Sequence, residues 1–362
     1  MGQSVNRIVT FGEIMVRMAP PGVQRIQQSL PGKLDVTFAG AEANVAASLA
    51  MLGKEVEFVT ALPEGPLTDS CIGNLRSAGI GTRHIRICDN GRFGIFFVET
   101  GANQRPTRVF YDRDYSSISL SGPGSFDWDQ ILTGASWLQL TGITPALSKS
   151  AADLTLQAAK RARELGIGVA LDCNFRSKLW RWDNSRTPLQ LASETLRQFL
   201  PYVTLLFGNE EDYRLLGFEC SPIAGESHQD RSVRFAKEVH RRFPNIQYFA
   251  TTFREQVSAT HNNWSGLLYE AQRDGVSVAP QRDGKIAPYE IRQIVDRVGS
   301  GDAFDAGILH GLTQPNFDPQ YTIEFATASS CLAHSIPGDW NYASLAEIEE
   351  LMHGSGSGRV VR

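Results

Sequence analysis

Cysteine is scarce in this sequence, and its placement limits what it can do. The five cysteines among 362 residues are scattered and odd in number, with no CxxC pair: Cys71, Cys88, Cys173, Cys220 and Cys331. This pattern disfavours a structural zinc site and a disulfide framework, and it predicts mostly buried thiols in a reducing compartment. The chain also lacks an apolar run of about 18 residues and a signal-peptide pattern, which disfavours a membrane partner. We therefore expect a cytoplasmic protein.

A strong charge of either sign is missing as well. The formal net charge is −4, and the hydrophobic and charged fractions of 42% and 20% are ordinary for a globular chain. A weakly acidic protein gives no sign of a nucleic-acid partner. The length suits one large α/β domain or two small ones. Small molecules are the partners that remain.

Short apolar runs alternate with helix-like segments along most of the chain. Strands are predicted at residues 8–14, 56–61, 137–140, 168–172, 246–252 and 264–270, with another in 203–212, and helices at 69–78, 148–165 and 321–335. Such alternation is typical of a parallel sheet covered by helices. Two further strands, 93–99 and 107–111, predict a hairpin. We expect this hairpin to pair with the excursion at 16–38 in a small sheet.

The most informative stretch is a glycine-rich turn between a strand and a helix. Tyr289–Val295 has the apolar content of a strand, and Gly299-Ser300-Gly301 follows it. A helix is then predicted by apolar residues that recur at spacings of four, which are Phe304, Ile308 and Leu312. Glycines let the backbone approach a ligand, and the free N–H groups of a helix start favour an anion.

An acid, Asp302, stands in the first turn of that helix. Its negative charge suits the helix dipole but would repel a phosphate bound at the same place. A carboxylate beside a phosphate makes sense if it takes a proton from an attacking hydroxyl. The alternative is a tight turn followed by an ordinary helix-start acid, because short glycine loops are common. The residues of the turn alone leave both interpretations open.

The longer pattern Asp-x-x-Gly-Ser-Gly-Asp-Ala-Phe-x-Ala-Gly, which starts at Asp296, resembles the C-terminal signature of the ribokinase-like, or phosphofructokinase B, carbohydrate kinases. By that resemblance Asp302 is the catalytic base, and Gly299, Ser300 and Gly301 form the anion hole for the transferring phosphate. The family commonly has Ala at Ser300 and Thr-Thr in place of Arg297-Val298. The resemblance implies ATP and Mg²⁺ as co-substrate and metal.

The segment Gly40-Ala41-Glu42-Ala-Asn44 precedes an alanine-rich helix. It resembles the family's sugar-binding signature, in which two small residues and an Asn hold substrate hydroxyls. These are Gly40, Ala41 and Asn44 here, and Glu42 lies where it also reaches a ligand. A tightly packed core helix is the alternative, which we accept for Ala46 to Leu52. The form Gly-Ala-Glu-x-Asn is typical of 2-keto-3-deoxygluconate kinases.

The hairpin contains Tyr111 and Arg113, which share one side of a strand because side chains alternate. A surface hairpin with solvated arginines is one interpretation. The pair also resembles the Tyr-x-Arg motif of keto-deoxygluconate kinases, in which both residues contact the sugar acid. Arg113 would offer a carboxylate a bidentate fork. A tyrosine that the family places in the preceding strand is Phe96 here.

Two more positions match residues that the family uses around the substrate. Asp172-Cys-Asn174-Phe-Arg176 follows a strand, and ligands of open α/β sheets bind at such carboxyl ends. The resemblance assigns Asn174 and Arg176 to nucleotide phosphate and sugar acid, and leaves Asp172 as structural. Near the C-terminus it assigns Asp339 to the substrate.

The nucleotide side resembles the family less closely. Asn209, Glu210 and Asp212 stand where the family has an Asn-x-x-Glu motif that arranges magnesium through water, although acids at a helix start are also ordinary caps. The resemblance assigns Asn209 to the nucleotide and Glu210 to the metal. The usual Lys-x-Gly-x-x-Gly is missing, and Thr252 and Arg254 stand in the comparable place. Residues 321–335 are expected to form a wall for the adenine.

Taken with the resemblance, the sequence predicts a ribokinase-like three-layer α/β/α sandwich with a small β-sheet lid. Residues 1–15, 39–91 and 115–362 are expected to form the main domain, and 16–38 and 92–114 the lid. The lid's free face predicts a homo-oligomer. The expected reaction is ATP-dependent phosphorylation of 2-keto-3-deoxygluconate at its terminal hydroxyl.

Three alternatives are weighed against that reaction. A neutral sugar such as fructose needs no carboxylate partner, which Arg113 and Arg176 would supply. A dinucleotide-dependent oxidoreductase needs G-x-G-x-x-G after the first strand, and Phe11-Gly12-Glu13 does not provide it. A non-catalytic sugar sensor on the same fold tends to lose the acid at Asp302, which is present.

Overall fold

A ten-stranded sheet runs through the computed structural model, which describes residues 6–219, 221 and 223–354. Its main path has the strand order β13 (Gly275–Ala279), β12 (His261–Glu270), β11 (Tyr248–Ser258), β10 (Leu205–Phe207), β9 (Gly168–Asp172), β8 (Ala135–Thr141), β1 (Arg7–Phe11), β4 (Val56–Pro63) and β5 (Ile85–Cys88). The pairs from β5 to β11 are parallel, and β12 and β13 are added antiparallel.

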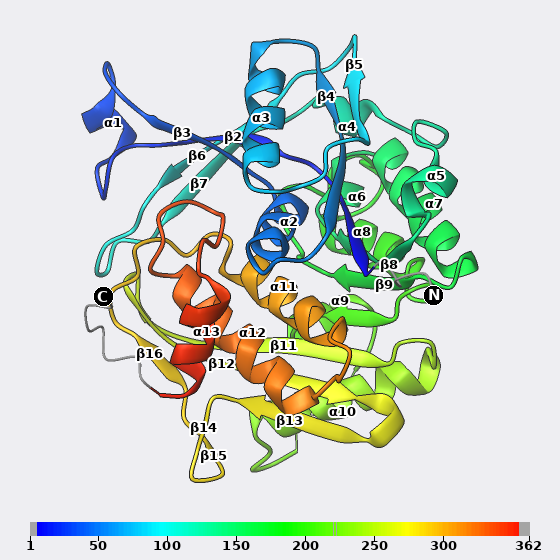
Figure 1. Cartoon of the computed structure of the whole chain (residues 1–362), viewed down its shortest axis with the longest axis vertical. Coiled ribbons are helices and arrows are strands. Elements are labelled where there is room, and N and C mark those ends of the chain that lie inside the picture. The colour runs from blue at the N-terminus through cyan, green and yellow to red at the C-terminus, as the bar shows by residue number, and fades with distance from the viewer. Residues whose placement is uncertain (1–5, 220, 222, 355–362) are drawn as a thin grey trace.

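Helices cover both faces of this sheet, as Figure 1 shows. One face carries α2 (Ala41–Met51), α3 (Pro66–Ser77), α11 (Ser300–Leu312) and α12 (Pro319–Ala333), with α13 (Leu345–Met352) packed on α12. The other face carries α4 (Ser117–Leu120), α5 (Trp128–Leu132), α6 (Thr144–Leu147), α7 (Lys149–Glu164), α8 (Pro188–Arg197), α9 (Glu210–Leu215) and α10 (His228–Arg242). The predicted α/β/α sandwich is confirmed.

Alternation along the strands explains the three layers. Ile8 of β1 and Phe58 of β4 lie in the core under α2 and α11, whereas their neighbours Val9 and Val59 lie in the core under α5 and α7. Because successive side chains of a strand point to opposite faces, a strand that is apolar throughout is buried on both. The near-continuous apolar runs of the sequence therefore specify the central position of these strands.

A second sheet has four strands in the order β3 (Asp35–Ala39), β2 (Met15–Ala19), β6 (Gly94–Glu99) and β7 (Arg108–Asp112). We call it the small sheet; the short helix α1 (Ile26–Ser29) lies between β2 and β3 in the chain. The predicted pairing of the excursion with the hairpin is present, because β2 runs parallel to β6. Figure 1 shows this sheet standing beside the main one, next to α2.

Three predicted strands have the wrong extent. The strand expected at residues 8–14 ends at Phe11. The strand expected at Tyr289–Val295 ends at Ile291 and pairs antiparallel with β12 as β16 (Tyr289–Ile291), so it is not a parallel core strand. The strand expected to end at Thr252 continues to Ser258, because it forms one long hairpin with β12. A two-stranded hairpin, β14 (Gln281–Arg282) and β15 (Lys285–Ile286), lies between β13 and β16 in the chain.

The cysteines agree with the expectation within the described residues. Cys71, Cys88 and Cys173 are buried free thiols and Cys331 is a partly buried one, while Cys220 and the tail beyond Gly354 lie outside the described residues. None of the helices in the described part of the chain has both the length and the apolar character needed to cross a membrane.

Candidate active site

The glycine turn and the start of α11 form the centre of the candidate site. Gly299 has a φ of +86°, and a Cβ there would lie 2.0 Å from the carbonyl oxygen of Asp339, so only glycine fits. Gly301 is exposed, and a Cβ built on it meets no atom within 4 Å. The first bond within the helix runs from Ala303 N to Gly299 O, so the amides of residues 300–302 precede the hydrogen-bonded ladder. Such amides suit an anion.

Asp302 is buried in the first turn of α11, where its carboxylate accepts a hydrogen bond from Asn44 Nδ2 at 2.6 Å. The pKa of Asp302 is raised to about 7: burial is the largest cause, the hydrogen bond from Asn44 and the charge of Arg176 act against it, and the charges of Asp339 and Glu42 add to it. A carboxyl group with that pKa is suited to general-base catalysis near neutral pH. The structure thus brings together five of the residues predicted from the sequence.

The first turn of α2 is fixed by its backbone surroundings. A Cβ on Gly40 would lie 2.0 Å from the carbonyl oxygen of Glu13, which precedes β2. Only glycine therefore fits at position 40. Asn44 is oriented by a bond from Gly40 N to its Oδ1 (3.2 Å), which leaves its Nδ2 for Asp302. Ala41, at the helix start, is partly exposed. This segment therefore places Asn44 rather than merely packing the core.

Glu42 points into the ends of the central strands. Its Oε1 accepts hydrogen bonds from Thr141 (2.7 Å) and Thr144 (3.2 Å), while its Oε2 is buried without a partner. Burial raises the pKa of this fully buried carboxyl group to about 7. Its carboxylate occupies the space that a side chain on Gly12 would need. The carboxylate of Glu42 therefore packs against Gly12, the residue that follows β1.

On the small sheet, Tyr111 and Arg113 lie together as predicted. The Arg113 guanidinium carbon is 5.3 Å from the centre of the Tyr111 ring, and that ring stacks on Phe96 at 5.9 Å. Arg113 is buried and forms an ion pair with Glu13, whose role the sequence did not reveal. The Nε atom of Arg113 and the Oε1 atom of Glu13 are buried and have no hydrogen-bond partner among the described residues. These orphaned atoms point to a polar group that completes the site.

The charges of two other predicted substrate residues, Asp339 and Arg176, act on Asp302. Asp339 is buried, and its pKa is raised to about 6 because the effect of burial exceeds the opposing charge of Arg17. Arg176 is exposed and bonds only locally, to Phe175 O at 3.3 Å, but its charge lowers the pKa of both Asp302 and Asp172. Asn174 has a φ of +40°, and its N–H bonds to Asp172 Oδ1 at 3.1 Å. Asp172 therefore holds the backbone of the loop that follows β9.

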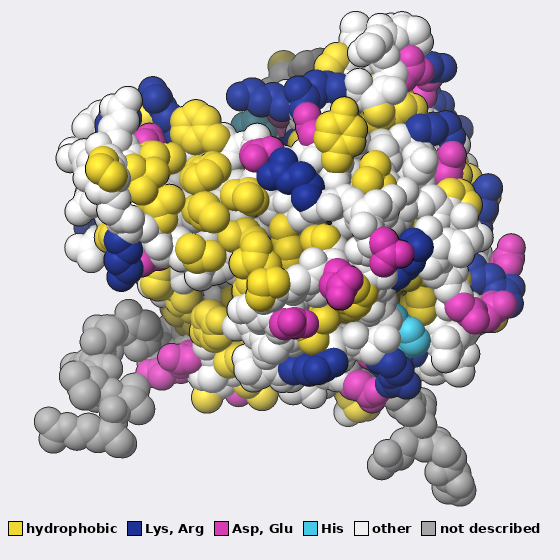
Figure 2. All heavy atoms as spheres, turned by 90° about the horizontal axis from the view of Figure 1, so that it is seen from above, with side chains coloured by type: hydrophobic (Ala, Val, Ile, Leu, Met, Phe, Trp, Pro, Cys, Tyr) yellow, Lys and Arg dark blue, Asp and Glu magenta, His cyan; other side chains and the backbone are white. Residues whose placement is uncertain are grey.

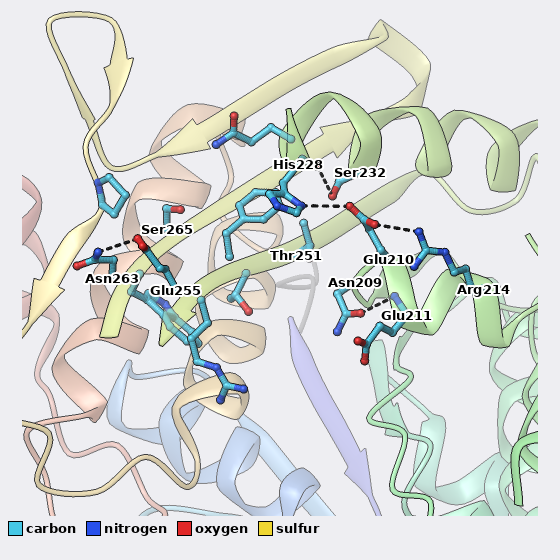
Figure 3. A pocket seen from close by; sticks show the side chains of 16 residues that line it. Asn209, Glu210, Glu211, Arg214, His228, Ser232, Thr251, Glu255, Asn263 and Ser265 are labelled. Carbon is cyan, nitrogen blue, oxygen red and sulfur yellow. Dashed lines mark hydrogen bonds and ion pairs between the residues drawn. The ribbon is translucent and has the colours of Figure 1, made fainter. Parts of the chain in front are cut away.

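A large cavity with a volume of about 940 Å³ lies between α9, α10 and the β11–β12 hairpin. Its lining includes four residues predicted to face the nucleotide or its metal, which are Asn209, Glu210, Thr252 and Arg254. Figure 3 shows Asn209 and Glu210 on one wall and the β11–β12 hairpin, with Glu255 and Asn263, on the other. A smaller hollow of about 110 Å³ shares Asn209 and Thr252 with this cavity and reaches Gly301. The smaller hollow therefore adjoins both the large cavity and the turn at Gly301.

The acids at this wall are engaged in local structure. Asn209 and Asp212 form a reciprocal cap on α9, because Asn209 Oδ1 accepts from Glu211 N at 2.7 Å and Asp212 Oδ2 accepts from Asn209 N at 2.9 Å. Glu210 pairs with Arg214 and Arg231, each at 3.3 Å, and faces His228 (Figure 3). The capping interpretation therefore holds for Asn209.

A resident magnesium ion does not fit these residues. Within residues 6–219, 221 and 223–354 no three His, Cys, Asp or Glu side chains are placed to hold a metal ion together. Both oxygens of Glu210 already meet cations or His228. Since Mg²⁺ commonly binds through substrate phosphates and one or two carboxylates, a metal would have to arrive with a phosphate ligand.

The extended hairpin explains the missing glycine loop. Residues 253–258, where the family has glycines, continue β11 and pair with β12 through Arg254↔Trp264 and Glu255↔Asn263. The hairpin tip is tied down, because Ala259 N bonds to Asn103 O at 2.7 Å and Ala259 O accepts from Arg297. Arg297, a departure within the signature, thus joins the phosphate turn to the hairpin.

Comparison with known proteins agrees with this geometry. The family described as pfkB family carbohydrate kinase matches residues 5–244. The chain belongs to the pfkB family of carbohydrate kinases. This carbohydrate kinase is 30% identical over 352 residues, 97% of its length and 98% of the relative's, to 2-dehydro-3-deoxygalactonokinase of Haloferax volcanii. It is 29% identical over 336 residues, 91% and 90% of the two chains, to 2-dehydro-3-deoxygluconokinase of Bacillus subtilis.

Solved structures give the same family. The crystal structure of 2-dehydro-3-deoxygluconokinase from Thermotoga maritima superposes on this kinase with a TM-score of 0.85 at 41% identity, covering 96% of this chain and 99% of the other. A fructokinase from Xylella fastidiosa with bound ATP matches with a TM-score of 0.74 at 21% identity, covering 98% and 100%, and shows the shared fold. The predicted family and fold are confirmed.

The buried charge on Glu42 makes stability depend on pH. Its pKa is raised from 4.5 to about 7 in the folded state, so the folded state binds the proton more tightly than the unfolded state. Stability should therefore fall as pH rises from 4.5 to 7, by up to about 3 kcal/mol. Glu42→Gln removes this loss. Denaturant unfolding of both proteins at pH 5 and pH 8 should show the variant gaining relative stability at pH 8. A difference that is the same at both pH values would contradict the buried ionisation.

Proposed function

We propose that this kinase transfers the γ-phosphate of ATP to the terminal hydroxyl of a 2-keto-3-deoxy sugar acid, most closely 2-keto-3-deoxygluconate. The observation that carries the proposal is Asp302, a buried carboxyl group with a pKa of about 7 at the start of α11. It directly follows the glycine turn Gly299–Gly301 and accepts a hydrogen bond from Asn44 of α2. The sugar-acid names of the 30%- and 41%-identical relatives support the substrate class.

The chemistry follows from these positions. Asp302 takes the proton of the sugar hydroxyl, whose oxygen attacks the γ-phosphorus while the bond to the β-phosphate oxygen breaks and ADP leaves. The amides of Gly299, Ser300 and Gly301 face the negative charge on the transferring group. The nucleotide occupies the large cavity, with Asn174, Asn209, Thr252 and Arg254 along its phosphates. Mg²⁺ carried by the nucleotide would offset phosphate charge, and Glu210 would reach it through water.

On the sugar side, Gly40, Ala41, Glu42 and Asn44 hold hydroxyl groups from the main domain. Tyr111, Arg113 and Arg176 face the carboxylate of the sugar acid, and Asp339, which lies near Asp302, also contacts the substrate. The small sheet acts as the lid, with segments 16–38 and 92–114 over the core formed by 1–15, 39–91 and 115–362. The enzyme works in the cytoplasm, where ATP is available and its free thiols stay reduced.

A neutral ketose is the second candidate, and one observation favours it. Glu13 already balances the charge of Arg113, so a neutral ligand would leave no charge unpaired at this arginine. A sugar acid would instead compete with Glu13 or bind the unpartnered Nε. The selectivity of Arg113 variants separates these cases.

Removal of the base tests the reaction itself. Asp302→Asn should lower kcat by at least 100-fold while the KM values stay within about tenfold, because the lost interaction acts in the transition state. In the unchanged enzyme, kcat/KM should rise with pH through about 7, since Asp302 must lose its proton to act. Steady-state kinetics from pH 5.5 to 8.5 check both. Turnover of the variant close to that of the unchanged enzyme would remove Asp302 as the base.

Recognition of the carboxylate is tested at Arg113. Arg113→Ala should cost about 2–5 kcal/mol in kcat/KM for 2-keto-3-deoxygluconate, the range for breaking a buried charge pair, and far less for the neutral ketose. The KM for ATP should hardly change. Arg108→Ala is the matched control, because Arg108 is exposed on β7, the strand that ends directly before Arg113, and lies on the face opposite Tyr111. Equal losses for acid and neutral sugar would favour the ketose.

The outer face of the small sheet predicts a homo-oligomer. The alternate residues of its strands form an apolar face. Its half-buried Met18, Phe38 and Ile95 also pack against the core under α2, whereas half-buried Phe97 and exposed Val36 and Phe110 do not belong to that core. Figure 2 shows hydrophobic side chains gathered over this part of the molecule. A patch of this kind is typical of an interface. A second copy of the same face is the partner that fits it.

Light scattering at micromolar concentration should therefore give a mass above the 39.9 kDa of one chain. Phe110→Glu should return the protein to one chain, because a charge in an apolar interface is costly to bury. Leu189→Glu is the control, since Leu189 is a comparably exposed apolar residue on α8. An unchanged enzyme that is monomeric and fully active would contradict the proposed assembly.

A further inference from the structure

The inner face of the small sheet holds a buried arginine that the sequence did not mark. Arg17 is the middle residue of β2, between Thr37 of β3 and Phe96 of β6, and only 4% of it is exposed. It lies on the face of Met15, Phe96 and Val98, opposite the apolar outer face. A charge at that depth requires partners, because an unpaired buried ion is very costly.

Both terminal nitrogens of Arg17 meet carboxylates of the main domain. Nη2 pairs with Asp296 Oδ2 and Nη1 pairs with Asp339 Oδ1. The side chains of these two aspartates are 6% and 3% exposed. A planar guanidinium presents several donors in a fixed fork, so it holds two carboxylates at a set separation in a way that a single ammonium does not.

Asp296 shapes the chain that enters the phosphate turn. Its Oδ1 accepts hydrogen bonds from the amides of Arg297 (2.8 Å) and Val298 (3.1 Å), the two residues before Gly299. Its Oδ2, the atom that meets Arg17, also accepts from Gly338 N at 3.3 Å. One carboxylate thus ties the start of the turn to the loop that contains Asp339.

Asp339 supports the turn from its other side. Its carbonyl oxygen lies against Gly299 so closely that no Cβ fits between them. Its carboxylate shares Asn44 with Asp302, and its charge is one of those that raise the pKa of the base. The two aspartates held by Arg17 therefore contact the anion hole and the neighbour of the base.

We propose that Arg17 is a positioning residue of the phosphoryl-transfer site, which clamps Asp296 and Asp339 so that the turn from Gly299 to Gly301 keeps its geometry. The inference rests on the proposed function of that turn. Arg17 touches neither Asp302 nor the large cavity in this structure, so it acts through the two aspartates. Its place on β2 also makes the anion hole depend on the seating of the small sheet.

The test compares Arg17→Lys and Arg17→Met with the unchanged enzyme. Lysine keeps the buried cation but cannot bridge both carboxylates, so this variant carries the test even if the methionine variant folds poorly. We expect kcat of Arg17→Lys to fall by about 100-fold, the loss that a 1 Å misplacement causes. The KM for ATP and the melting temperature should stay close to those of the unchanged enzyme. Arg92→Met is the control, because Arg92 makes a bidentate pair with Asp112 at the exposed surface.

A binding measurement separates positioning from general loss of structure. Aluminium fluoride, which mimics the transferring phosphoryl group, should tighten ADP binding to the unchanged enzyme and not to Arg17→Lys, while ADP alone binds both equally. Unchanged kcat and unchanged aluminium fluoride effect in Arg17→Lys would overturn the inference, and so would equal weakening of ADP alone. If the unchanged enzyme phosphorylates no sugar or sugar acid, the proposed function fails instead.

Discussion

The burial of Asp302 among other acids is the constraint on which the site depends. Its carboxyl group lies at a helix start with the charges of Asp339 and Glu42 near it, and desolvation lifts its pKa to about 7. Deeper in the same helix, burial raises the pKa of Asp305 well above its usual range, with the charges of Asp172 and Asp302 adding to the effect. Each buried charge costs free energy, so this density of buried carboxyl groups indicates that they serve a function.

Three arginines offset that charge, and each comes from a different part of the chain. Arg17 meets Asp296 and Asp339, Arg113 meets Glu13, and Arg176 acts on Asp172 and Asp302. Two of them stand on or beside the small sheet, so the electrostatic balance of the main domain requires that sheet to be in place. The apolar contacts and the ion pairs of the small sheet therefore both favour its position against the main domain.

Much of the fold was readable from the sequence because it rests on local patterns. Apolar runs such as Ile8 to Phe11 specify strands buried on both faces, and the glycine turn with Phe304, Ile308 and Leu312 specifies a helix start. The β11–β12 extension was missed because residues 254–257 are exposed and lack the apolar pattern of a buried strand. The strand β16 was predicted too long for the opposite reason, since the apolar Ile294 and Val295 lie in a loop that packs on the end of α12.

The site was predictable where the residues are contiguous and not where they pair across the chain. The group of Gly40, Asn44 and Asp302 converges as expected from two separate motifs. The partners of the arginines did not emerge, because Arg17 and Asp339 are 322 residues apart and Glu13 and Arg113 are 100 apart. An isolated arginine in the apolar run Met15 to Ala19 was the one local signal for such a pair.

The central claim is that a sugar acid receives the γ-phosphate of ATP on its terminal hydroxyl. The most direct measurement incubates the purified protein with ATP, Mg²⁺ and 2-keto-3-deoxygluconate and follows the phosphorus NMR spectrum. The account predicts one ADP for each new phosphomonoester, whose signal is split by the two protons of a CH₂ group. Release of inorganic phosphate alone, or a phosphoester formed only with a neutral ketose, would contradict it.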